Sequence, residues 1–160
     1  MAYADYEFYK NVYFGSAVPE SDFARMAERA SDWVDVMTFD RLTDGLPENA
    51  SAQKRIKKAV CELAEIFEKL EQAEKKAFAA ASAVDSADGT TGVIVSKSSG
   101  AESISYASPQ QIGASAKEWS TIYSAAGDPE KTKELLVKTA LPLLMGIRTD
   151  DGLPILYAGG

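Results

Sequence analysis

Residues 51–70, which read SAQKRIKKAVCELAEIFEKL, decide the fold of this chain. From Ile56 to Leu70 apolar residues recur at spacings of 3, 1, 3, 3, 1 and 3, which places them in one stripe along a helix. Ser51 is a candidate N-cap, and the pattern continues to about Ala81. Such a helix has roughly 30 residues and a length of about 45 Å. That is long for one small globule.

A second stripe with the same spacing begins at Phe23. Pro19 suits the first position of a helix, and two acidic residues follow it near the positive end of the helix dipole. We therefore predict a helix from Pro19 to about Thr38. Residues 40–49, with a glycine and a proline, are predicted to form a loop. Because two matching stripes favour antiparallel packing, residues 17–84 are predicted to form a helical hairpin.

Residues 1–16 form an aromatic N-terminal arm, in which six aromatic residues lie within the first 14 positions. The tyrosines recur every three or four residues, as on one face of a short helix. Either the arm covers the core of its own domain, or it contacts a neighbouring subunit, because a large apolar surface seldom stays exposed. Under the second alternative, Tyr6 and Tyr9 are candidate contacts.

Residues 85–108 differ in composition and are rich in Ser, Gly, Thr and Ala. β-branched residues flank a Ser-Ser-Gly turn and predict a β-hairpin on a flexible loop. A two-stranded hairpin is marginal in water, so it needs the helices or another chain for support. The candidate contact residues of this segment are Val93, Ile94, Val95, Ile104 and Tyr106.

Residues 109–146 are predicted to hold one or two C-terminal helices. Ser108-Pro109 and Asp128-Pro129 each combine a capping side chain with a proline at the first helical position. Pro142 removes a backbone donor and is expected to bend or end the last helix. In residues 147–160, a turn leads into an extended apolar tail whose candidate partner contacts are Ile155, Leu156 and Tyr157.

The predicted fold class is mainly α. We expect a single domain, residues 1–160, built as a small helical bundle with two long amphipathic helices, a β-hairpin insertion and one or two C-terminal helices.

The charge and the residue types present exclude several classes of function. The net charge of −7 argues against a general nucleic-acid or acidic-membrane binder. One cysteine cannot form an intrachain disulfide, and without histidine the common zinc patterns are impossible. The N-terminus lacks a signal peptide, and no stretch approaches the roughly 18 apolar residues of a membrane span. We expect a soluble protein of the cytoplasm that needs no metal or cofactor.

No catalytic site is predicted. Serine or cysteine nucleophiles usually need a histidine base, and the sequence has no nucleophile elbow, phosphate-binding loop or dinucleotide fingerprint. The glutamates from Glu62 to Glu71 fall on the polar face of the long helix and are interpreted as a solvated surface. Cys61 lies at the edge of the apolar stripe, where a half-buried hydrophobe is expected rather than a reactive thiol. Asp150-Asp151-Gly152 is interpreted as a plain turn.

Four cations lie close to the start of the long helix: Lys54, Arg55, Lys57 and Lys58. Cations at a helix N-terminus oppose the dipole and one another. Either they form a solvated surface, or they pair with acidic groups of a partner subunit. In the second case, replacement of Lys57 and Lys58 by Glu would weaken assembly at low salt.

The order of motifs along the chain resembles that of the small head-tail connector (adaptor) proteins of long-tailed bacteriophages and prophages. The matching stretches are Tyr3-Ala-Asp-Tyr-Glu-Phe-Tyr9, Tyr13-Phe-Gly15, Val18-Pro-Glu-Ser-Asp-Phe23, Ala30-Ser-Asp-Trp33, Thr38-Phe-Asp-Arg41, Lys58-Ala-Val-Cys-Glu-Leu-Ala-Glu65, Ser103-Ile-Ser-Tyr106 and Gly152-Leu-Pro-Ile-Leu-Tyr-Ala-Gly159. The resemblance covers most of the chain. It departs at residues 128–142, where the family usually has a shorter helical stretch.

This resemblance implies a structural subunit and no reaction. A subunit of this kind would form a ring of about twelve copies in the virion neck, and the ring would be assembled in the host cytoplasm. The ring would join the portal protein to the next connector (stopper) or tail-completion protein and continue the DNA channel without binding DNA specifically. The alternative from another class is a small helical DNA-binding or packaging-regulatory protein of the same phage, for which only residues 54–58 offer a basic helix.

Overall fold

The computed structural model describes residues 1–83 and 114–156, and within these ranges the chain is mainly helical, as predicted. The predicted β-hairpin, with Val93 to Val95 and Ile104 to Tyr106, lies outside the described residues, as do Tyr157 and the Ser108-Pro109 helix start. The elements are α1 (Tyr6–Phe8), the π-helix η1 (Tyr9–Tyr13), α2 (Glu20–Thr38), α3 (Ala50–Ala83), α4 (Ala114–Ala125) and α5 (Pro129–Leu144).

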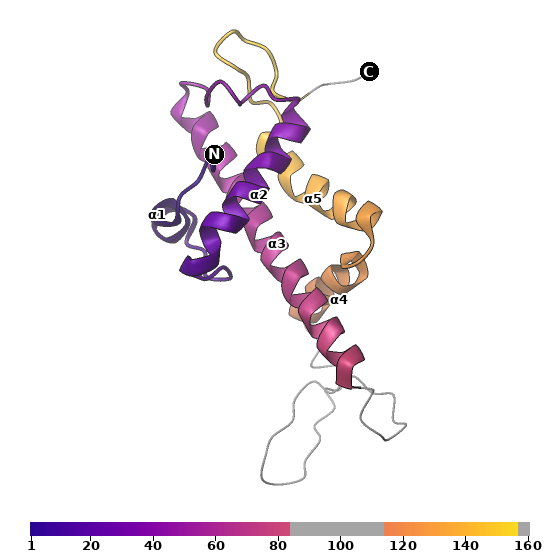
Figure 1. Ribbon diagram of the computed structural model, residues 1–160. Helices are drawn as coiled ribbons and strands as arrows, with labels where there is room; N and C mark the ends of the chain where they lie inside the picture. Colours follow the sequence, from indigo (N-terminus) through magenta and orange to yellow (C-terminus); the bar gives the residue numbers. More distant parts are fainter. Residues whose placement is uncertain (84–113, 157–160) are drawn as a thin grey trace.

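Helix α3 is the spine of the molecule, and the other elements pack along it (Figure 1). Helix α2 runs antiparallel to its first half. Helix α5 covers another side of the same half, while α4 lies against the second half. The predicted stripe of α3 is buried at every position, except that Ile66 is half-buried. The spacing of apolar residues in the sequence therefore identified the side of α3 that faces the core.

The helix ends differ in detail from the sequence predictions. The side chain of Asn49, not that of Ser51, caps α3 by accepting hydrogen bonds from the backbone N–H groups of residues 51 and 52 at 2.9 and 3.1 Å. Pro19 is extended and precedes α2 as its N-cap residue, so the helix begins one position later than predicted. Asp128 caps α5 with Pro129 in its first turn, which confirms that prediction.

The N-terminal arm covers the core of its own chain, which was the first of the two alternatives for it. The side chain of Tyr9 is fully buried, and its ring packs at a tilt against that of Phe23, with ring centroids 4.7 Å apart. Tyr6 is half-buried and meets the edge of the same ring. Gly15 is buried against the Tyr9 ring, and its backbone N–H donates to the Tyr9 carbonyl at 2.9 Å.

The C-terminal segment folds back instead of extending, which corrects the sequence prediction. After α5 the chain turns at residues 149–152, so that Arg148 and Pro154 form an antiparallel bridge. The N–H of Ile155 then donates to the carbonyl of Ile147 at 3.0 Å, and both side chains are buried in the main core. Residues that follow a turn can pack in the core when other elements leave apolar surface uncovered there. The local sequence does not show whether such a surface exists.

Pro142 lies inside the last turn of α5, and the helix ends two residues later at Leu144. The terminal carbonyls of this helix have a partner on α3, because the guanidinium of Arg55 donates to the carbonyls of Pro142 and Met145 at 3.3 and 2.7 Å. A cation at a helix C-terminus also interacts favourably with the dipole. No helix in the described part of the chain is long and apolar enough to cross a membrane.

Candidate interaction surfaces

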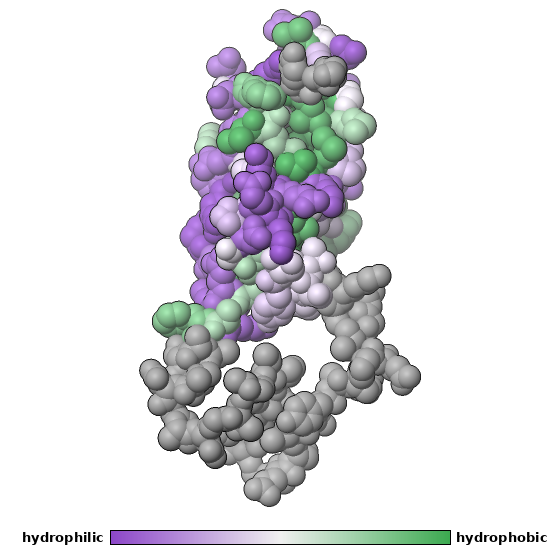
Figure 2. All heavy atoms as spheres, turned by 90° about the vertical axis from the view of Figure 1, so that its right-hand side faces the viewer, coloured by the Kyte–Doolittle hydropathy of each residue, from purple (hydrophilic) through white to green (hydrophobic). Residues whose placement is uncertain are grey.

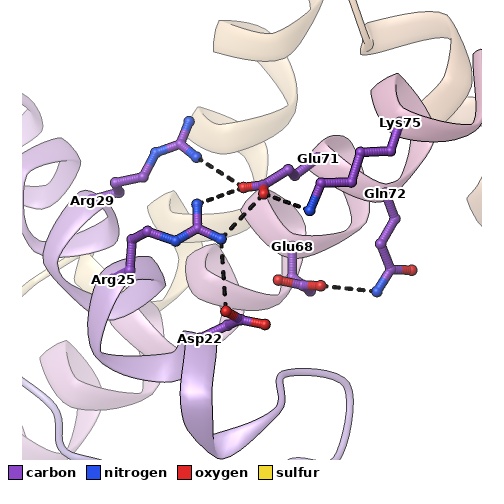
Figure 3. Close-up of polar contacts among 7 residues, drawn as sticks. All are labelled: Asp22, Arg25, Arg29, Glu68, Glu71, Gln72 and Lys75. Atoms are coloured by element: carbon purple, nitrogen blue, oxygen red, sulfur yellow. Dashed lines mark hydrogen bonds and ion pairs between the residues drawn. The ribbon is translucent and has the colours of Figure 1, made fainter. Parts of the chain in front are cut away.

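The polar side of α3 is bonded to its neighbours, which corrects its interpretation as a solvated surface. Figure 3 shows Glu71 at the centre of a cluster of cations from α2 and α3. The two terminal guanidinium nitrogens of Arg25 donate hydrogen bonds to this carboxylate, with nitrogen to oxygen distances of 2.6 and 3.1 Å. The ammonium nitrogen of Lys75 lies 2.9 Å from a carboxylate oxygen, and a guanidinium nitrogen of Arg29 lies 3.8 Å from one. Hydrogen bonds from Arg25 and Lys75 lower the pKa of Glu71 to about 2. This cluster holds α2 against α3.

Two other glutamates of the same side have partners as well. The carboxylate of Glu65 accepts a hydrogen bond from the Tyr9 hydroxyl at 2.8 Å, and that hydroxyl accepts one from the Val18 N–H at 3.0 Å. Glu68 is buried and accepts a hydrogen bond from Gln72 at 2.9 Å. Glu65 therefore ties the N-terminal arm to α3, whereas the bond of Glu68 is local to the helix.

The thiol of Cys61 and the possible metal ligands were the other candidates for chemistry among the described residues. Cys61 is fully buried rather than half-buried, and this burial raises the pKa of its thiol to about 12, so little thiolate is present at neutral pH. Within residues 1–83 and 114–156, no group of three or more Asp, Glu or Cys side chains could hold a metal ion.

Most of the predicted contact residues that the structure describes have partners within the chain. Tyr9 and Ile155 are fully buried, so their side chains are not free to meet a second protein here. Leu156 is half-buried against the main core. The ammonium of Lys57 lies 5.6 Å from the centre of the Phe8 ring, and Lys58 is half-buried nearby on the same helix. The structure thus does not gather these residues into one surface.

The basic cluster at the start of α3 divides between two roles. Arg55 is occupied with the end of α5, as described above. Lys54 and Lys58 lie one turn apart on the helix, and neither forms an ion pair with a described residue. The charge of Lys58 favours the ionised form of the Glu62 carboxyl. Burial has the larger effect, so the pKa of Glu62 is raised. Lys54 is therefore exposed on the surface, whereas Lys58 is half-buried beside Glu62.

Exposed apolar residues lie on the outer side of α5 and in the turn that follows it, and none of them is among the predicted contact residues. Leu141 and Met145, four residues apart, are 37% and 58% exposed, and Leu153 from the following turn is 57% exposed. Figure 2, which faces α5, shows apolar residues gathered on the upper part of this side above a band of hydrophilic residues. We call Leu141, Met145 and Leu153 the α5 face.

A signal for this surface was present in the sequence. Residues 135–145 read LLVKTALPLLM, which places apolar side chains on almost every side of the helix. One side, with Leu136, Ala140 and Leu144, is buried in the core. A helix that is apolar all round in a small protein has a second side to cover.

The comparisons with known proteins return nothing: no family model, no curated protein and no solved structure matches this chain. Its function is therefore inferred from its own residues and geometry.

Proposed function

We propose that this chain is a structural adaptor subunit of a phage or prophage head-tail connector, which assembles into a ring between the portal protein and the next neck or tail component. The observation that carries the proposal is the ordered series of motifs from Tyr3 to Gly159 that resembles this family. The described residues form a mainly helical frame, which suits a part that bears contacts.

The exposed side chains support a role in assembly. The α5 face leaves Leu141, Met145 and Leu153 on the surface, and apolar side chains gathered on a surface often mark a protein contact. A net charge of −7 would let DNA pass along a ring lumen without adhering to it. In this proposal the protein works in the virion neck and is assembled in the host cytoplasm.

A DNA-binding or packaging-regulatory role is less well supported. It would rest on the cations at residues 54–58, but Arg55 bonds to the end of α5 and Lys57 lies over Phe8. The two remaining lysines are few for phosphate binding, which normally engages several cations at once.

The direct test is to mix the purified protein with portal particles of the same phage or prophage and to image the mixture by electron microscopy. We expect a ring on one end of the portal, with native mass spectrometry giving the number of copies. The variant Leu141→Gln/Met145→Gln is the matched comparison, because it makes the α5 face polar without touching the buried side of the helix. Failure to bind the portal, together with tight binding to duplex DNA, would overturn the proposal in favour of the alternative.

A further inference from the structure

The buried side chains of the described residues form two separate cores along α3. The main core takes in the N-terminal arm, α2, the first half of α3, α5 and the C-terminal turn. The smaller core lies where α4 packs on the second half of α3 (Figure 1), and its buried residues are Leu70, Ala73, Ile122 and Ala125. No described residue of the arm or of α2 belongs to it. The attachment of α4 therefore depends on contacts that most of the frame does not share.

Few apolar side chains hold α4 in place. Of its side chains that the structure describes, Ile122 and Ala125 are buried, whereas Tyr123 is 47% exposed. Trp119 is half-buried, and the ammonium of Lys76 lies 4.8 Å from the centre of its ring. Because hydrophobic stabilisation is roughly proportional to the apolar area buried, this small core contributes far less free energy than the main core.

The side of α4 that faces α5 is hollow. A cavity of about 390 Å³ lies between the two helices and is lined mainly by polar side chains, among them Ser120 and Ser124 of α4 and Lys131 and Lys138 of α5. These two helices therefore do not pack closely along this side. The apolar support of α4 comes mainly from α3, with Leu135 of α5 half-buried at the edge of the small core.

The C-terminal end of α4 offers a pivot. The hydroxyl of Thr132, in the first turn of α5, donates to the carbonyl of Ala125 at 2.8 Å and ties the end of α4 to α5. Between these two residues Gly127 has a φ of 80°, a left-handed conformation that glycine adopts without strain. Glycine also reaches other backbone conformations more readily than any other residue, so a rotation at this point meets little resistance.

We propose that α4 is a lid on the spine helix, which leaves α3 as a unit, with Gly127 as the hinge, while the main core stays folded. A weakly packed unit opens at a lower free energy than the whole chain unfolds. The open chain presents Leu70 and Ala73 of α3 and Leu135 of α5, which the closed chain covers. A protein that binds these side chains would shift the population towards the open form. The inference does not depend on the adaptor role.

Two thiols on α3 measure the two kinds of opening in one molecule. Cys61 lies in the main core, and Ala73→Cys places a second thiol under α4, at a position that is also fully buried. Labelling in native buffer, followed by digestion and mass spectrometry, gives the rate at each site. The thiol at position 73 should react about a hundredfold or more faster than Cys61, because it waits only for α4 to leave. Ala64→Cys, the same change in the main core, is the control and should be labelled as slowly as Cys61.

Leu144→Ala separates local opening from global unfolding. Leu144 belongs to the main core, which the proposal leaves intact in the open chain, so its loss weakens the closed and the open forms equally. The variant should speed the labelling of Cys61 by more than about tenfold and that of position 73 by less than about twofold. The same acceleration at both positions would overturn the proposal, because α4 would then leave only when the whole chain unfolds. Ile56→Val, a milder change in the same core, gives the same comparison if Leu144→Ala does not fold.

Hydrogen exchange repeats the comparison without the added thiol, which places an extra atom in a packed site. Away from α3, a helix of 12 residues is marginal in water, so its backbone N–H groups exchange whenever α4 opens. Residues 119–125 should exchange at the same rate in the parent and in Leu144→Ala, whereas α2 should exchange faster in the variant. Equal acceleration of both segments would also overturn the proposal.

Discussion

Arg25 of α2 and Glu71 of α3 form a two-pronged ion pair, with nitrogen to oxygen distances of 2.6 and 3.1 Å (Figure 3). The pair joins two residues that are 46 positions apart in the chain, one on each helix. The guanidinium fork fits a carboxylate better than a single ammonium does, so the pair fixes the relative position of α2 and α3 as well as contributing free energy.

Replacing Glu71 with Gln should lower the free energy of unfolding by about 1 kcal/mol at pH 7, the upper end for exposed pairs. The pKa of Glu71 is lowered to about 2 from its ordinary 4.5, so its contribution is complete above about pH 4.5 and is lost as the pH falls towards 2. Urea unfolding at pH 7 and pH 2 measures this. Glu74→Gln, an exposed change one turn away, is the control. An E71Q effect that persists at pH 2 would contradict the assignment.

Tyr9→Phe should cost about 1–3 kcal/mol, because removing the hydroxyl leaves Glu65 and the Val18 N–H without their hydrogen bonds. Burial raises the pKa of Tyr9 to about 12 from 10, so the stability linked to its neutral form is complete below about pH 10 and is lost as the pH rises through 12. Denaturant unfolding and phenolate absorbance check both points. Tyr123→Phe, at an exposed position, should change neither, and an equal effect there would contradict the prediction.

Gly15→Ala should destabilise the protein by about 1–3 kcal/mol, because a Cβ at this position would lie 2.0 Å from the Tyr9 ring and force the arm to shift. Thermal unfolding followed by circular dichroism measures the change. Ser16→Ala, at the exposed neighbouring position, should have little effect. Similar melting temperatures for the two variants would show that the arm is not packed as described.

Substitutions on the two sides of α5 should change the free energy of unfolding by very different amounts. Leu144→Ala should cost about 2–5 kcal/mol, because Leu144 is fully buried in the core. Leu141→Gln changes a partly exposed position and should alter the free energy of unfolding by no more than about 0.5 kcal/mol. Denaturant unfolding of the free chain distinguishes them. A large loss for Leu141→Gln would mean that this side already belongs to the core.

Cys61 should resist thiol reagents in the folded protein, because it is fully buried and its thiol pKa is raised to about 12. We expect modification only at the rate at which the chain opens, measured by mass spectrometry with and without urea. Rapid labelling of the native protein, at a rate that urea does not increase, would contradict this burial.

Much of the fold could be predicted from residue spacing. The stripes that begin at Phe23 and Ile56 each bury one side of a helix, and Asp128-Pro129 marks the start of α5 as expected. These features follow from the helical repeat and from capping, which act over a few neighbouring residues. The bounds of α2 were therefore predicted to within one residue.

The candidate surfaces depended on contacts that no short window of sequence contains. The same periodicity that identified the buried side of α3 made its glutamates resemble a solvated surface, yet Arg25 and Tyr9 lie against them. Ile155 appeared to be part of an open tail, yet it returns to the core beside Ile147.

The sequence by itself determined which sides of the helices are apolar, where α5 begins, and that the chain has no histidine and one cysteine. Only the tertiary structure decided which apolar side is covered, so that Leu144 lies in the core while Met145 is left on the surface. The reason is physical: amphipathicity is fixed by spacing along one helix, whereas burial depends on partners that are distant in the chain and are brought together by folding.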